Sequence, residues 1–238
     1  MKKRVGVNID GIIRNYLDRF EKVYTSTYIY NPSLVDANEE MTEIRFLSEE
    51  EEIERDKKTE QTISEKITKP IDSHDLLNHF HFEPGVDFGG DEIDARGKME
   101  EFMYEFKAYN IFAQADAYPH AVDALHKLQM IGEKEGFDVV LFSTLKNKAI
   151  TATYSFLSGV ACRARNIMFL KNDFDKWEHC DVLFDVVPEA FQSKPNGKIV
   201  VKIENDANQW DEADFSYKTL KDAIKDQILI EKISNLLK

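Results

Sequence analysis

One stretch near the N-terminus decides the fold: Arg4-Val5-Gly6-Val7-Asn8-Ile9-Asp10-Gly11-Ile12-Ile13-Arg14-Asn15. Small and β-branched residues lead into Asn-Ile-Asp-Gly and then into a helical pattern, which indicates a buried first strand that ends in a polar turn. In an open α/β sheet, ligands and catalytic groups collect at the carboxyl ends of the strands. Asn8 and Asp10 flank Ile9, so an extended backbone would point both polar side chains the same way. We therefore expect a functional site at this turn.

Composition limits the class of protein. The chain has 238 residues, of which 42% are hydrophobic, and this suits one α/β domain or a core with an inserted subdomain. Its formal charge of −13 opposes binding to duplex nucleic acid or to an anionic membrane. There is no run of 18 apolar residues, the start Met1-Lys2-Lys3-Arg4 leads into a predicted strand without the apolar region expected of a signal peptide, and Cys162 and Cys180 lack metal-type spacing. We expect a soluble, cytoplasmic protein.

Apolar periodicity divides the chain into alternating helices and strands. Helices are predicted over about 12–24, 93–112, 119–128, 148–158 and 217–237, and strands over 137–144, 166–170, 182–184 and 198–203. The helix over 93–112 has a predicted apolar stripe of Met99, Phe102, Met103, Phe106 and Tyr109. Strands that alternate with helices favour a parallel sheet with right-handed crossovers.

An acidic segment interrupts this pattern. Residues 36–66 contain 12 acidic and 5 basic residues, and Glu49–Glu52 is a run of four like charges. Such a run is usually a solvated helix face or a mobile excursion, and a surface for cations or a basic partner is the alternative. The sequence thus predicts an acidic, mostly helical insertion over 31–112, partly mobile at 36–68, between core segments 1–30 and 113–238.

The opening stretch resembles the first motif of the haloacid dehalogenase-like (HAD) phosphotransferases, Asp-x-Asp-Gly after an apolar strand, and within them the 5'(3')-deoxyribonucleotidase-like branch. The resemblance covers about residues 3–27 and 113–238 and implies a three-layer, Rossmann-like α/β core with a cap insertion. In the family the first Asp is the nucleophile, but this chain has Asn8, whose neutral amide cannot form an aspartyl-phosphate. Asp10 matches the second Asp, which acts as general acid and base in working relatives.

Two later segments extend the resemblance. Ser143-Thr144-Leu145-Lys146 falls where the family has its second motif, a strand-end hydroxyl that hydrogen-bonds the phosphoryl group. Lys176 takes the third-motif role of a cation, and Asp185 takes the fourth-motif role of a magnesium ligand. The spacing between them is one residue shorter than the usual pattern, and Val186 replaces the second Asp of the fourth motif. Taken alone, a strand-end Ser or Thr and a lysine are commonly structural.

The resemblance also implies a magnesium site formed by Asp10 and Asp185. Magnesium prefers hard oxygen ligands and usually binds through one or two carboxylates. Asn8 and Val186 each remove a negative charge that would help to hold the ion, so the sequence weakens this expectation.

Three functional hypotheses follow. The first is a HAD-like pseudoenzyme that serves as a binding or structural component with a protein partner, because losing a nucleophile typically costs many powers of ten in rate. The second is an altered magnesium-dependent phosphohydrolase, in which Asp10 activates water on a phosphate or nucleotide held by Ser143, Lys146 and Lys176. The third is a partner-binding module that uses the acidic insertion, such as a viral accessory or virion protein assembled in the cytoplasm.

Overall fold

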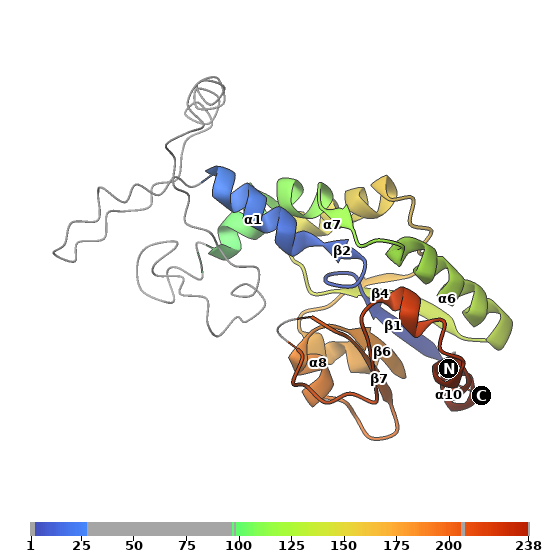
Figure 1. Ribbon diagram of the computed structural model, residues 1–238. Coiled ribbons are helices and arrows are strands. Elements are labelled where there is room, and N and C mark those ends of the chain that lie inside the picture. Colours follow the sequence, from blue (N-terminus) through green and yellow to red (C-terminus); the bar gives the residue numbers. More distant parts are fainter. Residues whose placement is uncertain (1–2, 28–96, 98, 206–207, 238) are drawn as a thin grey trace.

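A six-stranded parallel sheet forms the centre of the protein (Figure 1). The computed structural model describes residues 3–27, 97, 99–205 and 208–237. Within them the strand order is β5-β4-β1-β6-β7-β8, and the strands are β1 (Arg4–Asn8), β4 (Asp138–Ser143), β5 (Ile167–Phe169), β6 (Val182–Asp185), β7 (Ile199–Ile203) and β8 (Phe215–Tyr217). The predicted α/β class and parallel sheet are confirmed.

Helices cover both faces of the sheet and give three layers. One face is covered by α6 (Ala121–Glu135), α7 (Lys148–Gly159), α9 (Leu220–Ala223) and α10 (Gln227–Leu236), and the other by the 3-10 helix η4 (Asp173–Glu178) and α8 (Pro188–Gln192). Because side chains alternate along a strand, Val5 and Val7 face the first group of helices while Gly6 faces the second.

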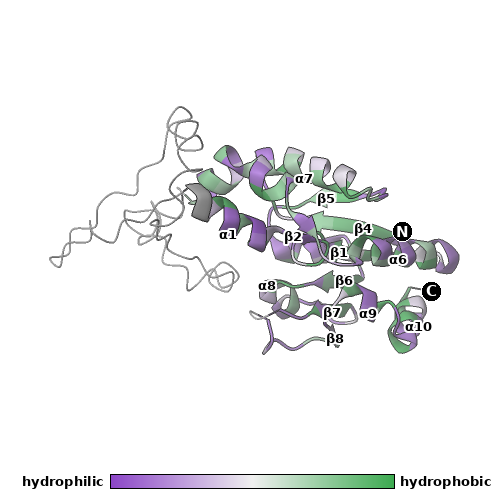
Figure 2. Cartoon of the chain, turned by 45° about the horizontal axis from the view of Figure 1, so that its top comes forward, coloured by the Kyte–Doolittle hydropathy of each residue, from purple (hydrophilic) through white to green (hydrophobic). Residues whose placement is uncertain are grey.

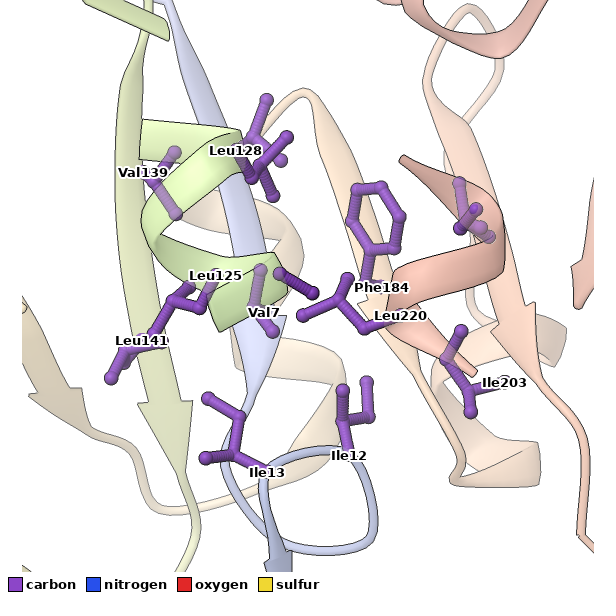
Figure 3. Close-up of a cluster of buried hydrophobic side chains, with 14 of the residues drawn as sticks. Val7, Ile12, Ile13, Leu125, Leu128, Val139, Leu141, Phe184, Ile203 and Leu220 are labelled. Atoms are coloured by element: carbon purple, nitrogen blue, oxygen red, sulfur yellow. The ribbon is translucent and has the colours of Figure 1, made fainter. Parts of the chain in front are cut away.

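The main core lies between the sheet and α6. Figure 3 shows Val7, Leu125, Leu128, Phe184 and Leu220 converging between β1, β6 and the covering helices. In Figure 2 the central strands are coloured mainly as hydrophobic, whereas the helices mix hydrophobic and hydrophilic residues. This pattern is expected of a parallel sheet that is buried on both faces.

A second cluster lies beside the sheet. Helix α1 (Tyr16–Thr27) and α7 pack against residues 99–113, which we call the return limb because they lead back from the insertion to the core. The return limb contains two π-helical turns, η2 (Phe102–Phe106) and η3 (Tyr109–Ala113). A small antiparallel ladder, β2 (Arg14–Asn15) with β3 (Asp116–Ala117), joins the start and end of this excursion.

The first helix begins later than the sequence predicted. Residues 10–13 form a turn, and α1 starts at Tyr16 rather than near Ile12. Gly11 has a φ of 85°, and a Cβ there would lie 2.6 Å from the Val186 side chain. The turn therefore depends on glycine, and it allows Arg14 to point inward from β2.

The predicted apolar stripe of the return limb is only partly right. Phe102 and Met103 are buried, but Phe106 and Tyr109 are 61% and 59% exposed, and Ile111 and Phe112 are buried instead. The cause is the π-helical winding, together with a break at Lys107, where φ is −111° and ψ is 15°. Both shift the phase of a pattern that was calculated for 3.6 residues per turn.

The C-terminal prediction also needs correction. In place of one helix over 217–237, the chain forms β8, α9 and α10. Asp226 is extended and its carboxylate caps α10 by accepting from the Ile228 and Leu229 amides, so it separates the two helices.

Helix α6 starts at Ala121, after His120 adopts a left-handed φ of 63°, rather than at Pro119.

Most of the predicted insertion, including 36–68, lies outside the described residues, so its acidic, helical character stays a prediction. In the part of the chain that the structure describes, no helix has the length and apolar character needed to cross a bilayer.

Gly6→Ala tests the tight packing beneath β1. A Cβ at Gly6 would lie 2.9 Å from Cδ2 of Phe142 and 3.1 Å from Sγ of Cys180, so we expect the free energy of unfolding to fall by about 1–3 kcal/mol. Urea denaturation provides the measurement. Gly159→Ala, where nothing lies within 4 Å of the added carbon, is the matched control and should change stability by less than about 0.5 kcal/mol. Equal effects of the two substitutions would contradict this account.

Candidate functional site

Polar side chains gather where three neighbouring strands end. Asn8, Ser143 and Asp185 are the last residues of β1, β4 and β6, and Asp10 follows β1 by two residues. These residues and Lys176 form what we call the strand-end site. Parallel pairing brings them together, because Asn8 pairs with Phe142 and Val7 with Phe184.

Asn8 is 4% exposed and contacts the backbone of the following turn. Its Nδ2 donates to the main-chain carbonyl of Asp10 at 2.9 Å. An ionised aspartate at position 8 could not donate this bond, because a carboxylate is only an acceptor. The amide therefore fits this geometry without any bridging ion.

Asp10 is held through its side chain on the other side of the turn. Its Oδ1 accepts from Nε of Arg14 at 2.8 Å and lies 2.7 Å from Nη2. Its Oδ2 accepts from Oγ of Ser143 at 3.1 Å. Strand β1 ends at Asn8, so the alternation of side chains along a strand does not continue to Asp10. The positions of Asn8 and Asp10 are set by their hydrogen bonds and not by the extended backbone that the sequence predicted.

Arg14 is the site residue that sequence reasoning missed. It is fully buried, and besides Asp10 it donates through Nη1 to the Phe112 carbonyl at 3.0 Å and through Nη2 to Oγ1 of Thr153 at 3.1 Å. Its guanidinium also lies over the rings of Phe112 and Phe156, 5.2 and 5.1 Å from their centroids. The available signal was an arginine four residues after Asp10, inside an otherwise apolar run.

Lys176 and Asp185 form a second buried pair. Their Nζ and Oδ2 atoms are 2.7 Å apart and both side chains are fully buried, while Asp173 lies 2.6 Å from the same ammonium. Burial alone would lower the pKa of Lys176, but the two carboxylates outweigh burial and raise it. The other oxygen of Asp185 accepts from the amides of Val186 and Val187.

The other two residues predicted to contact phosphate, Thr144 and Lys146, are not fully buried. Thr144 is half-buried, and Lys146 is exposed, with its ammonium 2.7 Å from Glu100 of the return limb. The same ammonium lies over the Tyr104 ring, 5.3 Å from its centroid. The structure therefore joins Asn8, Asp10 and Ser143 directly, but it engages Lys146 with the return limb.

Two tyrosines lie near Asp10. Burial and the negative charge of Asp10 both raise the pKa of Tyr16 and of Tyr104, so these phenols stay neutral at ordinary pH. Tyr104 stacks on Phe112, the residue whose carbonyl binds Arg14. Aromatic side chains thus form one wall of the strand-end site.

Two buried side chains, Asn208 and Lys202, hold the loops beside the site through hydrogen bonds to main-chain carbonyls. Nδ2 of Asn208 donates to the carbonyls of Val186 and Ile203, both at 2.9 Å. Lys202, which is 6% exposed, donates to the carbonyls of Asn208 and Asp211. Sequence reasoning did not single out either residue, because their partners are backbone atoms that only the folded chain brings close.

A cavity of about 420 Å³ lies elsewhere, beside α8. It is lined by Phe191, Gln192, Lys194, Val200, Asp211, Glu212, Ala213 and Asp214, so the strand-end residues do not line it. The cavity and the strand-end site are therefore separate features of the protein.

Comparison with known proteins identifies the fold. No protein-family model and no curated protein sequence matches the chain. Among solved structures, YfnB of Bacillus subtilis, a HAD-hydrolase bound to magnesium, has a TM-score of 0.51 at 11% identity and covers 96% of this chain and 98% of its own. The chain has the HAD-hydrolase fold.

Two further HAD hydrolases support this assignment. A haloacid dehalogenase-like hydrolase of Burkholderia xenovorans has a TM-score of 0.53 at 8% identity, covering 97% of this chain and 99% of its own. A family IA, variant 3 HAD hydrolase of Entamoeba histolytica has a TM-score of 0.52 at 10% identity, covering 99% of both chains. At these identities the likeness establishes the fold alone.

The residues present do not fit the magnesium ion that this HAD fold implies. Magnesium needs hard oxygen ligands, but both oxygens of Asp10 are engaged by Arg14 and Ser143, and both oxygens of Asp185 by Lys176 and backbone amides. Among the described residues, no group of three or more His, Cys, Asp or Glu side chains is placed to hold a metal. Magnesium binding by Asp10 and Asp185 stays a prediction that this donor set does not support.

Lys176→Met and Lys146→Met form a matched test of the buried pair. Each lysine has a carboxylate at 2.7 Å, but the Lys176–Asp185 pair is fully buried whereas Lys146 and Glu100 are 50% and 44% exposed. Because Lys176→Met leaves the buried Asp185 carboxylate without its cation, we expect the free energy of unfolding to fall by about 3–5 kcal/mol. Lys146→Met should cost less than about 1 kcal/mol. Chemical denaturation measures both, and similar losses would show that burial does not decide the strength of this pair.

Proposed function

We propose that this protein is a HAD-like pseudoenzyme, related to the 5'(3')-deoxyribonucleotidases, that acts as a binding or structural component. The observation that carries the proposal is the Asn8 amide, which donates to the Asp10 carbonyl at the end of β1. By the sequence resemblance, position 8 corresponds to the nucleophile of the family. A carboxamide has no anionic oxygen with which to attack phosphorus, so the covalent route has no first step.

The surrounding contacts support the same function. Catalysis would require Asp10 to exchange protons with a substrate or water, but here its carboxylate is engaged by Arg14 and Ser143. Lys176 is paired with Asp185 and Asp173, and Lys146 with Glu100. The cations that would receive a phosphate therefore already have carboxylate partners within the chain.

The proposal predicts no phosphatase activity. Purified protein incubated with magnesium and a panel of deoxynucleoside monophosphates should release no phosphate above a no-protein control, and no phosphoenzyme should accumulate. We expect Asn8→Asp alone to remain inactive, because Arg14 and Ser143 still hold Asp10. Robust turnover by the unmodified chain would refute the proposal. Turnover gained by Asn8→Asp would show that the rest of the site is competent and that residue 8 alone blocks it.

A binding role would fall to the acidic insertion, whose residues 36–66 carry 12 acidic and 5 basic side chains. Such an excess of negative charge suits a basic protein partner, and the attraction should weaken as salt screens it. Deleting residues 36–68 should abolish formation of the complex while circular dichroism shows that the core remains folded. Partners that still co-purify with the truncated chain would exclude this surface.

A further inference from the structure

Lost catalysis does not explain why Arg14 is buried. Its side chain is fully inaccessible to solvent, and removing a guanidinium from water costs several kcal/mol unless partners compensate for the lost hydration. The compensation here is unusually complete, since one carboxylate, one carbonyl and one hydroxyl surround the group, with two aromatic rings beside it. A residue held in this way has a defined position and a defined charge.

We propose that Arg14 is a built-in cation that organises the strand-end site in place of a divalent metal ion. Carboxylates at neighbouring strand ends repel one another unless cations compensate their charges. In this chain Asp10 has Arg14, Asp185 has Lys176, and the Asp10 carbonyl receives the Asn8 amide. Each of these oxygen groups is already compensated by the chain itself. The inference rests on the proposed function only in treating residue 8 as non-catalytic.

The shape of the guanidinium explains why an arginine serves this purpose. Its five N–H groups are fixed in one plane, so one side chain can bind several acceptors in different directions. Nε and Nη2 hold Asp10, Nη1 holds Phe112 of the return limb, and Nη2 also reaches Thr153 of α7. Arg14 therefore ties the turn after β1, the return limb and α7 into one unit.

Thermal unfolding of the full chain in magnesium and in chelator tests this role. The unmodified protein should unfold at the same temperature in both buffers. Arg14→Met should unfold at a lower temperature in chelator and gain several degrees in magnesium, because Oδ1 of Asp10 loses its partner and one carboxylate can hold magnesium together with water. Arg14→Lys, which keeps the charge, should show no magnesium response. An unmodified protein that responds to magnesium, or an Arg14→Met variant that does not, would overturn the inference.

Arg19→Met is the matched control. Arg19 also holds the return limb, by donating to the Asn110 carbonyl at 2.9 Å, and it donates to the Gln114 side chain just after the limb. It is only half-buried, and these hydrogen bonds do not involve Asp10. This variant should lose some stability without becoming sensitive to magnesium. A magnesium response in Arg19→Met equal to that of Arg14→Met would assign the effect to the limb rather than to the cation and would also overturn the inference.

Two further results keep the test decisive. If Arg14→Met does not fold, the double variant Asp10→Asn/Arg14→Met, which removes both charges, should recover folded protein, and a double variant as unfolded as the single one would refute the pairing with Asp10. Failure of the proposed function is separable, because phosphate release by the unmodified chain would refute that function and leave the unfolding temperatures unchanged. Magnesium-dependent unfolding of the unmodified chain would refute the role of Arg14 without supplying a nucleophile.

Discussion

The contact between Asp10 and Arg14 constrains the rest of the structure. An arginine can be fully buried only if its charge and its N–H groups find partners. To meet that requirement, the chain turns sharply at Gly11, pairs β2 with β3, and brings the Phe112 carbonyl and the Thr153 hydroxyl to the guanidinium. The turn after β1, the return limb and α7 are positioned by one ion pair at the end of the central strand.

The strand-end site contains two ion pairs whose charges are balanced within the chain. The pair of Lys176 and Asp185, with Asp173 beside it, and the pair of Arg14 and Asp10 are both internally compensated. Asn8 ends β1, the strand between β4 and β6, and its neutral amide adds no charge that a ligand would have to neutralise. A phosphate dianion would have to compete with carboxylates of the chain for these cations. On our proposal of a non-catalytic protein, this arrangement serves as a rigid structural site.

The sequence predicted the elements whose signals are local, and it missed those that depend on distant partners. Strands β1, β4, β5, β6 and β7 were predicted from short apolar runs, and the run that begins at Arg4 was sufficient to suggest the HAD-like core. Parallel pairing brings successive strand ends to one edge of the sheet, and the strand-end site there contains five predicted residues: Asn8, Asp10, Ser143, Lys176 and Asp185. Arg14 and Asn208 were missed, since their partners Phe112, Thr153 and Val186 are 22 to 139 residues away in sequence, and only the spacing of four residues between Asp10 and Arg14 was a local signal. The exposure of Phe106 was missed because no pattern in the sequence indicates a π-helical turn.

The β2–β3 ladder has a consequence for how such proteins diverge. Asn15 pairs with Asp116, so the ladder brings together two points of the chain that are about 100 residues apart. The entropy lost in closing a long loop grows only with the logarithm of its length, so that doubling the excursion costs about 0.6 kcal/mol. Evolution can therefore lengthen, trim or replace the segment between α1 and the return limb at little expense to the folded sheet, whereas α1 and the return limb themselves pack against α7. New binding specificities can accumulate there while the ancestral scaffold is left undisturbed.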